Sequence, residues 1–325
     1  MKNNIKNYLF YILIFLIITY LIILIFLEIN KNENYIETYV NSKKLENIEK
    51  VGNIPKIIWS YWDSGIKNGG YLVNKSYLSW KKYHPDYEII FLDDNNINEY
   101  IDIESYYKNI NFKQFNKMEK VKKADLIRCV LLSEYGGIWI DSSFLLIESL
   151  DWLLKSKEVL ENDKKIICFY QERFTKNEDI PIIENWFIAV SRNNKFMYLW
   201  KEEFYKYLKI GFKNYKKKIK NIDLQNIDIP VYLTMHVCAQ KVMQENPELV
   251  KEIYSLKSGT HPFKLHFDYE WDMHKLINDI FKKKKIDIPK MIKFRGHERA
   301  LFDKYIKEGK KYSEKSLYSR YIKNL

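Results

Sequence analysis

Two acidic residues and one arginine in the middle of the chain have types and spacing that could bind a charged ligand. They lie in residues 124–143, which read ADLIRCVLLSEYGGIWIDSS. Asp125 and Arg128 are three residues apart, which on a helix places them on the same side. Asp141 follows three apolar residues, where a buried strand would end, and ligands of open α/β sheets bind beyond the carboxyl ends of the strands. Two carboxylates and a guanidinium around one crevice suit a hydroxyl-rich ligand that carries phosphate.

Each of these residues also has an ordinary structural interpretation. As an exposed ion pair, Asp125 and Arg128 would stabilise a helix by roughly a few tenths of a kcal/mol. Asp141 would act as a turn residue, with the serines after it capping the next segment. The link between the helix and the strand favours the ligand site. Gly136 supplies the left-handed end that helices favour, and the chain then runs directly into the strand that leads to Asp141.

The elements around this stretch alternate between strand and helix. Short apolar runs bounded by glycine, proline or aspartate predict strands, whereas longer periodic runs predict helices. The strands are expected at residues 54–62, 87–92 and 138–140, and the helices at residues 74–83 and 115–135. This strand, helix, strand, helix, strand order predicts an α/β domain whose central sheet is mostly parallel.

The amino-terminal segment is strongly apolar. Residues 8–27 (YLFYILIFLIITYLIILIFL) contain no charged residue, proline or glycine, and a helix of about 20 residues crosses the hydrocarbon core of a bilayer. No small-residue cleavage pattern follows, so the segment predicts a retained single-pass membrane anchor at residues 1–28 rather than a buried core helix. Residues 29–50 would then be a polar stem and residues 51–325 the main domain. Lysines flank the span on both sides in nearly equal number, which leaves the side of the main domain open.

The charge and cysteine content limit the classes of partner. A net charge of +12 could indicate binding to nucleic acid. However, 48 of the 54 basic residues are lysines scattered along the chain, which indicates a compositional bias, and no nucleic-acid partner is expected. The three cysteines, Cys129, Cys168 and Cys238, form no Cys-x-x-Cys pair and are expected to be buried thiols.

The central stretch resembles the DXD-type retaining glycosyltransferases. This family includes capsular polysaccharide synthesis proteins, yeast-type initiating α-mannosyltransferases and, more distantly, the large clostridial glucosylating toxins. Its pattern is D-x-x-R followed by G-G-x-x-x-D-x-D. The residues that match this pattern in type and spacing are Asp125, Arg128, Gly136, Gly137 and Asp141.

Three other segments extend the resemblance over most of residues 54–297. The sequence IPKIIWSYWDSG at residues 54–65 is similar to the family's first strand, I-P-K-x-I-W. Two later blocks are matched more loosely, by ENWFIAVSRNN at residues 184–194 and by IPKMIKFRGH at residues 288–297.

The resemblance implies a GT-A-like α/β fold. Such a protein would transfer a sugar, expected to be a hexose, from a nucleotide-sugar donor to a glycan or polysaccharide acceptor, with retention of the anomeric configuration. It implies that Trp59 stacks near the donor base and that Asp125 and Arg128 hold the donor sugar. It also implies that Asp141 is the first acid of the DXD motif, beside which a divalent metal cofactor, Mn²⁺ or Mg²⁺, could be held. The chain departs from the family at Ser143, whose hydroxyl could contact the donor but is a poorer metal ligand than the second acid it replaces.

The last matched block contributes two further candidates. Breaking the bond to the sugar leaves a nucleoside diphosphate, so the site must present positive charge where negative charge develops. Lys293 and Arg295 would supply that charge if the late basic strand folds over the diphosphate. An alternative function is a non-catalytic protein of the same fold that binds a nucleotide-sugar or a glycan, with Ser143 marking lost chemistry. The joint presence of both acids and the arginine favours the enzyme.

Overall fold

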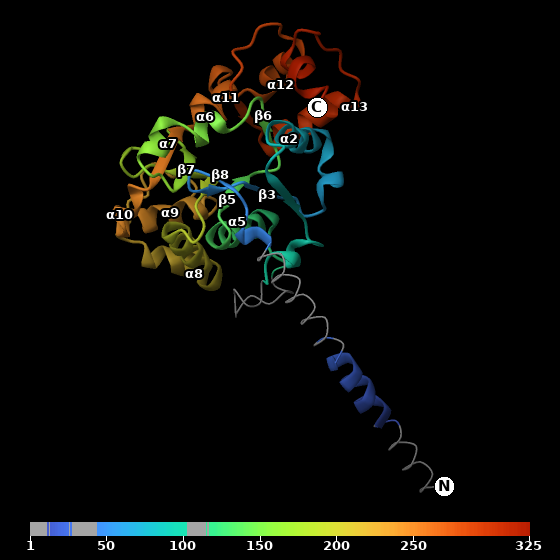
Figure 1. Ribbon diagram of the computed structural model, residues 1–325, viewed down its shortest axis with the longest axis vertical. Coiled ribbons are helices and arrows are strands. Elements are labelled where there is room, and N and C mark those ends of the chain that lie inside the picture. Colours follow the sequence, from blue (N-terminus) through green and yellow to red (C-terminus); the bar gives the residue numbers. More distant parts are fainter. Residues whose placement is uncertain (1–11, 13, 26, 28–43, 103–114, 116) are drawn as a thin grey trace.

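The computed structural model describes residues 12, 14–25, 27, 44–102, 115 and 117–325 (Figure 1). Within these residues the centre is a six-stranded sheet in the order β4-β3-β5-β8-β7-β9. Its strands are β3 (Ile57–Tyr61), β4 (Glu88–Leu92), β5 (Gly137–Ile140), β7 (Ile166–Tyr170), β8 (Ile183–Val190) and β9 (Ile253–Lys257). β8 runs antiparallel to β5 and β7, and the other pairs are parallel. The predicted α/β fold with a mostly parallel sheet is therefore confirmed.

Helices cover both faces of this sheet (Figure 1). α5, α8 and α9 pack on one face, in a core that includes Trp59 and Trp139, while Ile58 and Ile138 belong to the core on the opposite face. Neighbouring strand residues thus point to opposite faces, as a period of two requires. The labelled α-helices from residue 70 onwards are α2 (Gly70–Tyr83), α5 (Lys120–Glu134), α6 (Asp151–Leu154), α7 (Lys157–Glu161), α8 (Lys195–Lys218), α9 (Thr234–Glu245), α10 (Pro247–Val250), α11 (Lys264–Asp268), α12 (Met273–Lys282) and α13 (Gly296–Lys307).

A third cluster of buried side chains holds the carboxyl-terminal helices against α2. It contains Leu72 of α2, together with Leu145 and Ile292. The last two belong to β6 (Phe144–Leu146) and β10 (Met291–Lys293), which pair antiparallel outside the main sheet. This pairing brings the end of β10 against the serines that precede β6.

The observed elements lie close to the predicted ones. All three predicted strands are present, as β3, β4 and β5, and the cysteines are buried free thiols, as expected. The helix predicted at residues 115–135 begins later, at Lys120. α2 begins earlier than predicted, at Gly70, because the Asp303 carboxylate accepts a hydrogen bond of 3.0 Å from the backbone N–H of Leu72. A cap supplied by a distant residue leaves no local signal in the sequence.

Two glycines join α5 to β5 in a turn that other residues would strain. Gly136 and Gly137 have φ angles of 64° and 93°, in the left-handed region. A Cβ on Gly136 would lie 2.7 Å from the backbone nitrogen of Arg192, and one on Gly137 would lie 2.9 Å from the carbonyl oxygen of Ile57. The turn therefore fixes the separation between the helix that carries the arginine and the strand end that carries Asp141.

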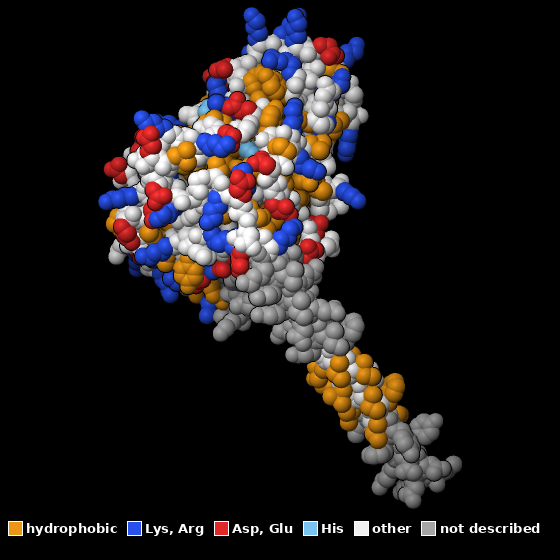
Figure 2. Space-filling model, viewed as in Figure 1, with side chains coloured by type: hydrophobic (Ala, Val, Ile, Leu, Met, Phe, Trp, Pro, Cys, Tyr) orange, Lys and Arg blue, Asp and Glu red, His pale blue; other side chains and the backbone are white. Residues whose placement is uncertain are grey.

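The expected membrane anchor is contradicted. The described helical stretch at the amino terminus covers residues 14–25, and its apolar side chains are exposed (Figure 2). Among the described residues, no helix has the length and apolar character needed to span a membrane. The prediction of a single-pass membrane protein anchored through residues 1–28 is therefore wrong.

The end of the predicted stem packs on the body of the molecule. Residues 29–43 lie outside the described residues. Leu45 is 1% exposed and belongs to the same core as α5 and α8, and its carbonyl oxygen accepts a hydrogen bond from the Arg192 guanidinium. Farther along, residues 50 and 51 form β1 (Lys50–Val51), which pairs with β2 (Ile54–Pro55). The described part of this segment is thus integral to the folded body.

Candidate functional site

A cleft of about 850 Å³ opens at the carboxyl-end edge of the sheet. Its walls come from the ends of β3, β5 and β7, the start of β8, one side of α5, the first turn of α9 and the segment from β10 into α13. Its size is typical of small-molecule sites, and ligands of open α/β sheets bind at this edge. The lining has more basic than acidic residues, which suits an anionic ligand. The basic residues are Lys120, Arg128, Arg173, Lys293, Arg295 and Arg299, and the acidic residues are Asp63, Asp125, Asp141 and Glu184.

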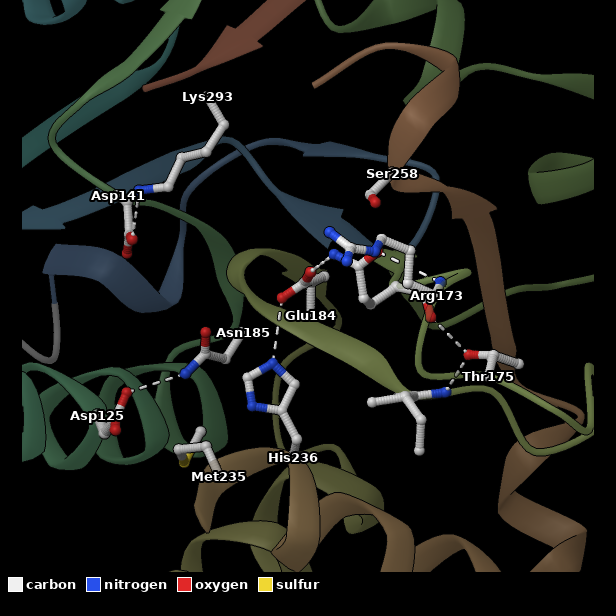
Figure 3. Close-up of polar contacts among 12 residues, drawn as sticks. Asp125, Asp141, Arg173, Thr175, Glu184, Asn185, Met235, His236, Ser258 and Lys293 are labelled. Atoms are coloured by element: carbon white, nitrogen blue, oxygen red, sulfur yellow. Dashed lines mark hydrogen bonds and ion pairs between the residues drawn. The ribbon is translucent and has the colours of Figure 1, made fainter. Parts of the chain in front are cut away.

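Arg128 joins the two predicted acids. Its Nη1 donates to Asp125 Oδ1 at 2.8 Å and its Nη2 donates to Asp141 Oδ1 at 2.9 Å. The guanidinium lies over the ring of Trp139 at 4.7 Å, and the indole N–H of Trp139 donates to Asp141 Oδ1 at 2.9 Å. Asn185, at the start of β8, donates to Asp125 Oδ1 at 3.0 Å (Figure 3). The structure therefore brings together the three residues that the sequence singled out.

The surroundings of the two carboxylates affect their ionisation in opposite directions. Burial raises the pKa of Asp125, and the charge of Arg128 opposes this rise without overcoming it. At Asp141 burial also acts to raise the pKa, but the charges of Lys293 and Arg128 together outweigh it, and the pKa is lowered. Asp141 is therefore held in its ionised form between two cations.

Lys293 and Ser143 lie at the same end of the cleft as Asp141. Lys293 Nζ donates to Asp141 Oδ2 at 2.7 Å, as Figure 3 shows, and lies 3.3 Å from Ser143 Oγ. The Ser143 hydroxyl in turn donates to the carbonyl oxygen of Phe294 at 2.8 Å. The late basic strand thus folds over the segment after β5, as the sequence analysis required for Lys293 to face a bound diphosphate.

Arg295 lines the same wall and is held by a buried acid. Its Nε donates to Glu298 Oε1 at 2.6 Å, and its guanidinium lies over the ring of Trp271 at 4.9 Å. Glu298 also contacts Nε2 of His266 at 2.8 Å, and both side chains are fully buried. Burial opposes ionisation of Glu298, but the hydrogen bonds from His266 and Arg295 prevail and lower its pKa to about 2. The carboxylate of Glu298 therefore fixes the orientation of Arg295.

Trp59 is not part of the cleft. Its side chain is fully buried, its indole N–H donates to the carbonyl oxygen of Gly136 at 2.9 Å, and its ring packs on Tyr135 at 5.6 Å. It lies in the middle of β3, on the face that α5 covers, because strand residues alternate between faces. The cleft is lined instead by Trp62, just beyond the end of β3, with the Arg299 guanidinium 4.6 Å from its ring.

A buried acid and a histidine that line the cleft were not selected as site residues from the sequence. Glu184 Oε2 lies 3.1 Å from His236 Nε2, and Glu184 Oε1 accepts a hydrogen bond of 3.1 Å from Gln171 (Figure 3). Glu184 and His236 are each 6% exposed. Glu184 begins the ENWFIAVSRNN block, which was a usable signal, but nothing in the sequence pairs it with a histidine 52 residues later on α9.

The side chains around Asp141 do not fit a divalent cation held in the DXD manner. Hard cations such as Mn²⁺ and Mg²⁺ need several oxygen ligands. Asp141 Oδ1 accepts from Arg128 and Trp139, and Oδ2 accepts from Lys293, so both oxygens already face donors. In the described part of the chain, no three or more His, Cys, Asp or Glu residues cluster as metal ligands would. The metal expected at Asp141 is therefore not supported by this arrangement.

The amino-acid sequence is similar to those of known proteins. A family model described as "Capsular polysaccharide synthesis protein" matches residues 19–305. The chain is 28% identical over 159 residues to O-glycosyltransferase braB of Annulohypoxylon truncatum, a match that covers 46% of this chain and 37% of that protein. It is 27% identical over 155 residues to glycosyltransferase afumC of Aspergillus fumigatus, covering 45% and 39%. The chain thus spans less than half the length of these relatives.

Similar solved structures are more distant. The PaToxG glycosyltransferase has a TM-score of 0.37 and 15% identity, and the match covers 68% of this chain and 95% of that chain. The glycosyltransferase GlyE of Streptococcus pneumoniae TIGR4 has a TM-score of 0.37 and 13% identity, with 80% and 65% covered.

Proposed function

The chain belongs to the capsular polysaccharide synthesis protein family, and on that premise we propose that it is a glycosyltransferase of GT-A-like fold. It moves a sugar, which we take to be a hexose, from a nucleotide-sugar donor to a glycan or polysaccharide acceptor with retention of configuration. We assign the catalytic unit to residues 51–325 together with residues 44–50, since Leu45 is buried in its core.

The observation that carries this proposal is the Asp125–Arg128–Asp141 cluster. One buried guanidinium contacts both carboxylates at the sheet edge where α/β proteins bind ligands. Asp125 and its neighbour Asn185 supply polar groups for the hydroxyls of the donor sugar. Asp141 and Ser143 line the cleft beside Lys293, and Arg295 and Arg299 line it as well, so there we place the diphosphate.

The proposed reaction moves one sugar without a change of oxidation state. The bond between C1 of the sugar and the oxygen of the distal phosphate breaks, and its electron pair stays on that oxygen. Lys293 and Arg295 stabilise the charge that develops there. The acceptor hydroxyl oxygen forms the new bond to C1, and its proton passes to the departing diphosphate. Attack on the face that the diphosphate leaves accounts for retention.

The alternative is a non-catalytic protein that binds a nucleotide-sugar or a glycan. Ser143 in place of an acid favours it, because the family's second carboxylate is missing. The two functions differ in turnover: the binding protein holds a donor without breaking its glycosidic bond to the diphosphate.

A donor screen on the full chain tests the proposal. Each of a panel of nucleotide-sugars is incubated with the protein and with oligosaccharide acceptors, and the release of nucleoside diphosphate is followed. We expect release from at least one donor, and proton NMR of the product gives its anomeric configuration. Binding of a donor without release would favour the alternative, and inversion at C1 would refute retention.

A further inference from the structure

We propose that Lys293 takes the place of the divalent cation, so that the chain binds the diphosphate of its donor without Mn²⁺ or Mg²⁺. This inference rests on the proposed function, because it concerns how the same site handles the leaving group. The supporting observation is the position of the Lys293 ammonium relative to Asp141 and Ser143, which occupy the two acidic positions of the DXD motif.

The Lys293 ammonium lies between those two positions. Its Nζ is 2.7 Å from Asp141 Oδ2 and 3.3 Å from Ser143 Oγ. A cation bound by a DXD motif would contact side chains at these same two positions. The ammonium is a hard, compact point charge, and its side chain is 12% exposed at the cleft wall, so a ligand in the cleft can reach it.

The backbone holds this lysine in place from both sides. β10 pairs with β6 so that Lys293 lies opposite Phe144, the residue that follows the motif. The Lys293 N–H donates to the carbonyl oxygen of Pro262 at 3.0 Å, and the Phe294 N–H donates to that of Ser143 at 3.0 Å. The ammonium therefore belongs to the architecture of the site rather than to a freely moving surface chain.

The remaining oxygens of the motif are committed to other partners. The Ser143 hydroxyl donates to the Phe294 carbonyl, and its side chain is buried. Asp141 Oδ1 accepts from Arg128 and from Trp139. A metal ion would have to displace Lys293 from Oδ2 and then gather its other ligands from water and phosphate alone.

Other cations of the cleft supply the charge that a single ammonium lacks. Arg295, Arg299 and Arg173 line the same cleft. The Arg173 guanidinium lies 5.4 Å from the ring of Trp271 and the Arg299 guanidinium 4.6 Å from the ring of Trp62, so both are placed against cleft-lining side chains. When the bond from C1 to the oxygen of the distal phosphate breaks, the electron pair stays on that oxygen. The N–H groups of these arginines and of Lys293 then stabilise the negative charge, and the step needs no metal ion.

The test is binding of nucleoside diphosphates to the full chain by calorimetry. UDP, GDP, ADP, CDP and dTDP are titrated into the wild type in EDTA and, separately, in Mn²⁺. We expect at least one to bind with the same Kd in both. Lys293→Met should weaken that binding in EDTA by about 10-fold to 100-fold, as loss of a charge-assisted hydrogen bond does. Added Mn²⁺ should then restore part of the affinity, because Oδ2 of Asp141 has become free.

Two further variants separate charge from structure. Lys293→Arg keeps a cation and should retain most of the affinity. Lys290→Met makes the same replacement three residues earlier, where the lysine contacts Glu148 at 2.7 Å and does not line the cleft. Its Kd should equal that of the wild type. A thermal melt of each variant verifies that it is folded at the temperature of the titration.

The outcomes distinguish this inference from the proposed function. If the wild type binds a nucleoside diphosphate in Mn²⁺ but not in EDTA, the inference is wrong and the donor site stands. If folded Lys293→Met binds as tightly as the wild type in EDTA, the inference is again wrong. If no nucleoside diphosphate binds under either condition, the proposed donor site fails and the inference fails with it.

Discussion

The replacement Asp125→Asn separates a structural ion pair from a ligand-binding one. The sequence alone is compatible with an exposed helix pair, but the side chains of Asp125 and Arg128 are only 5% and 4% exposed. Removing one partner of a buried pair costs about 3 kcal/mol. For a chain of this size each kcal/mol lowers Tm by roughly 2 °C, so we expect a fall of about 6 °C.

The matched control is Asp151→Asn. Asp151 pairs with Lys155 at 2.8 Å one helical turn away, and both side chains are about half exposed. The cost there should be under about 0.5 kcal/mol, which corresponds to about 1 °C. Scanning calorimetry of the two variants beside the wild type measures the difference.

Donor turnover is then measured at a temperature at which all three proteins are folded. If Asp125 holds the donor sugar in the transition state, Asp125→Asn should release nucleoside diphosphate about 100-fold more slowly, while Asp151→Asn should be unaffected. A large fall in Tm with normal turnover would leave a structural pair only. A fall no larger than that of the control would refute the energetic argument from burial.

Three other predictions concern the walls of the site. The pKa of Glu298 is lowered from 4.5 to about 2, so its ionised form contributes about 3 kcal/mol of stability above pH 4.5, and this contribution is lost as the pH falls towards 2. In urea unfolding, the difference in stability between the wild type and Glu298→Gln should therefore become smaller over that pH range. A difference that stays constant would contradict the assignment of this stability to the ionised carboxylate. Gly137→Ala should cost about 3 kcal/mol of stability in the same assay, because φ is 93° and the new Cβ would lie 2.9 Å from the carbonyl oxygen of Ile57. Gly309 has a φ of 61° but no atom near its Cβ position, so Gly309→Ala should cost about 1 kcal/mol. Equal costs would show that the contact with Ile57 does not matter. Trp62 lines the cleft, and we expect its ring to stack on the base of the donor. Trp62→Ala should then raise the Kd for nucleoside diphosphate about tenfold with little change in Tm, whereas Trp59→Phe should lower Tm without changing that Kd in the folded protein. The reverse pattern would return the stacking role to Trp59.

The site residues that could be predicted from the sequence are those carried by consecutive elements. The cluster of Asp125, Arg128 and Asp141 forms because a tight turn at Gly136 and Gly137 connects α5 to β5, and a side chain at either glycine would collide with neighbouring backbone atoms. Lys293 was a conditional candidate, since its place depends on the pairing of β10 with β6, and that pairing joins segments far apart in the chain.

The predictions that the structure did not bear out also have physical reasons. Trp59 matched a family position, but its place in the middle of β3 turns it towards α5 and the core. The pairing of Glu184 with His236 was invisible because the two elements meet only in the folded molecule. The membrane prediction rested on the length and composition of an apolar run alone, and no helix among the described residues is long and apolar enough to span a membrane.

The central claim is that Asp141, held between Arg128 and Lys293, acts on the donor of a glycosyltransferase. The most direct test is the rate at which the full chain releases nucleoside diphosphate from a nucleotide-sugar donor, compared with Asp141→Asn at a temperature at which both are folded. We predict measurable release by the wild type and release slower by about 100-fold in the variant. Release at the wild-type rate by folded Asp141→Asn would contradict the account.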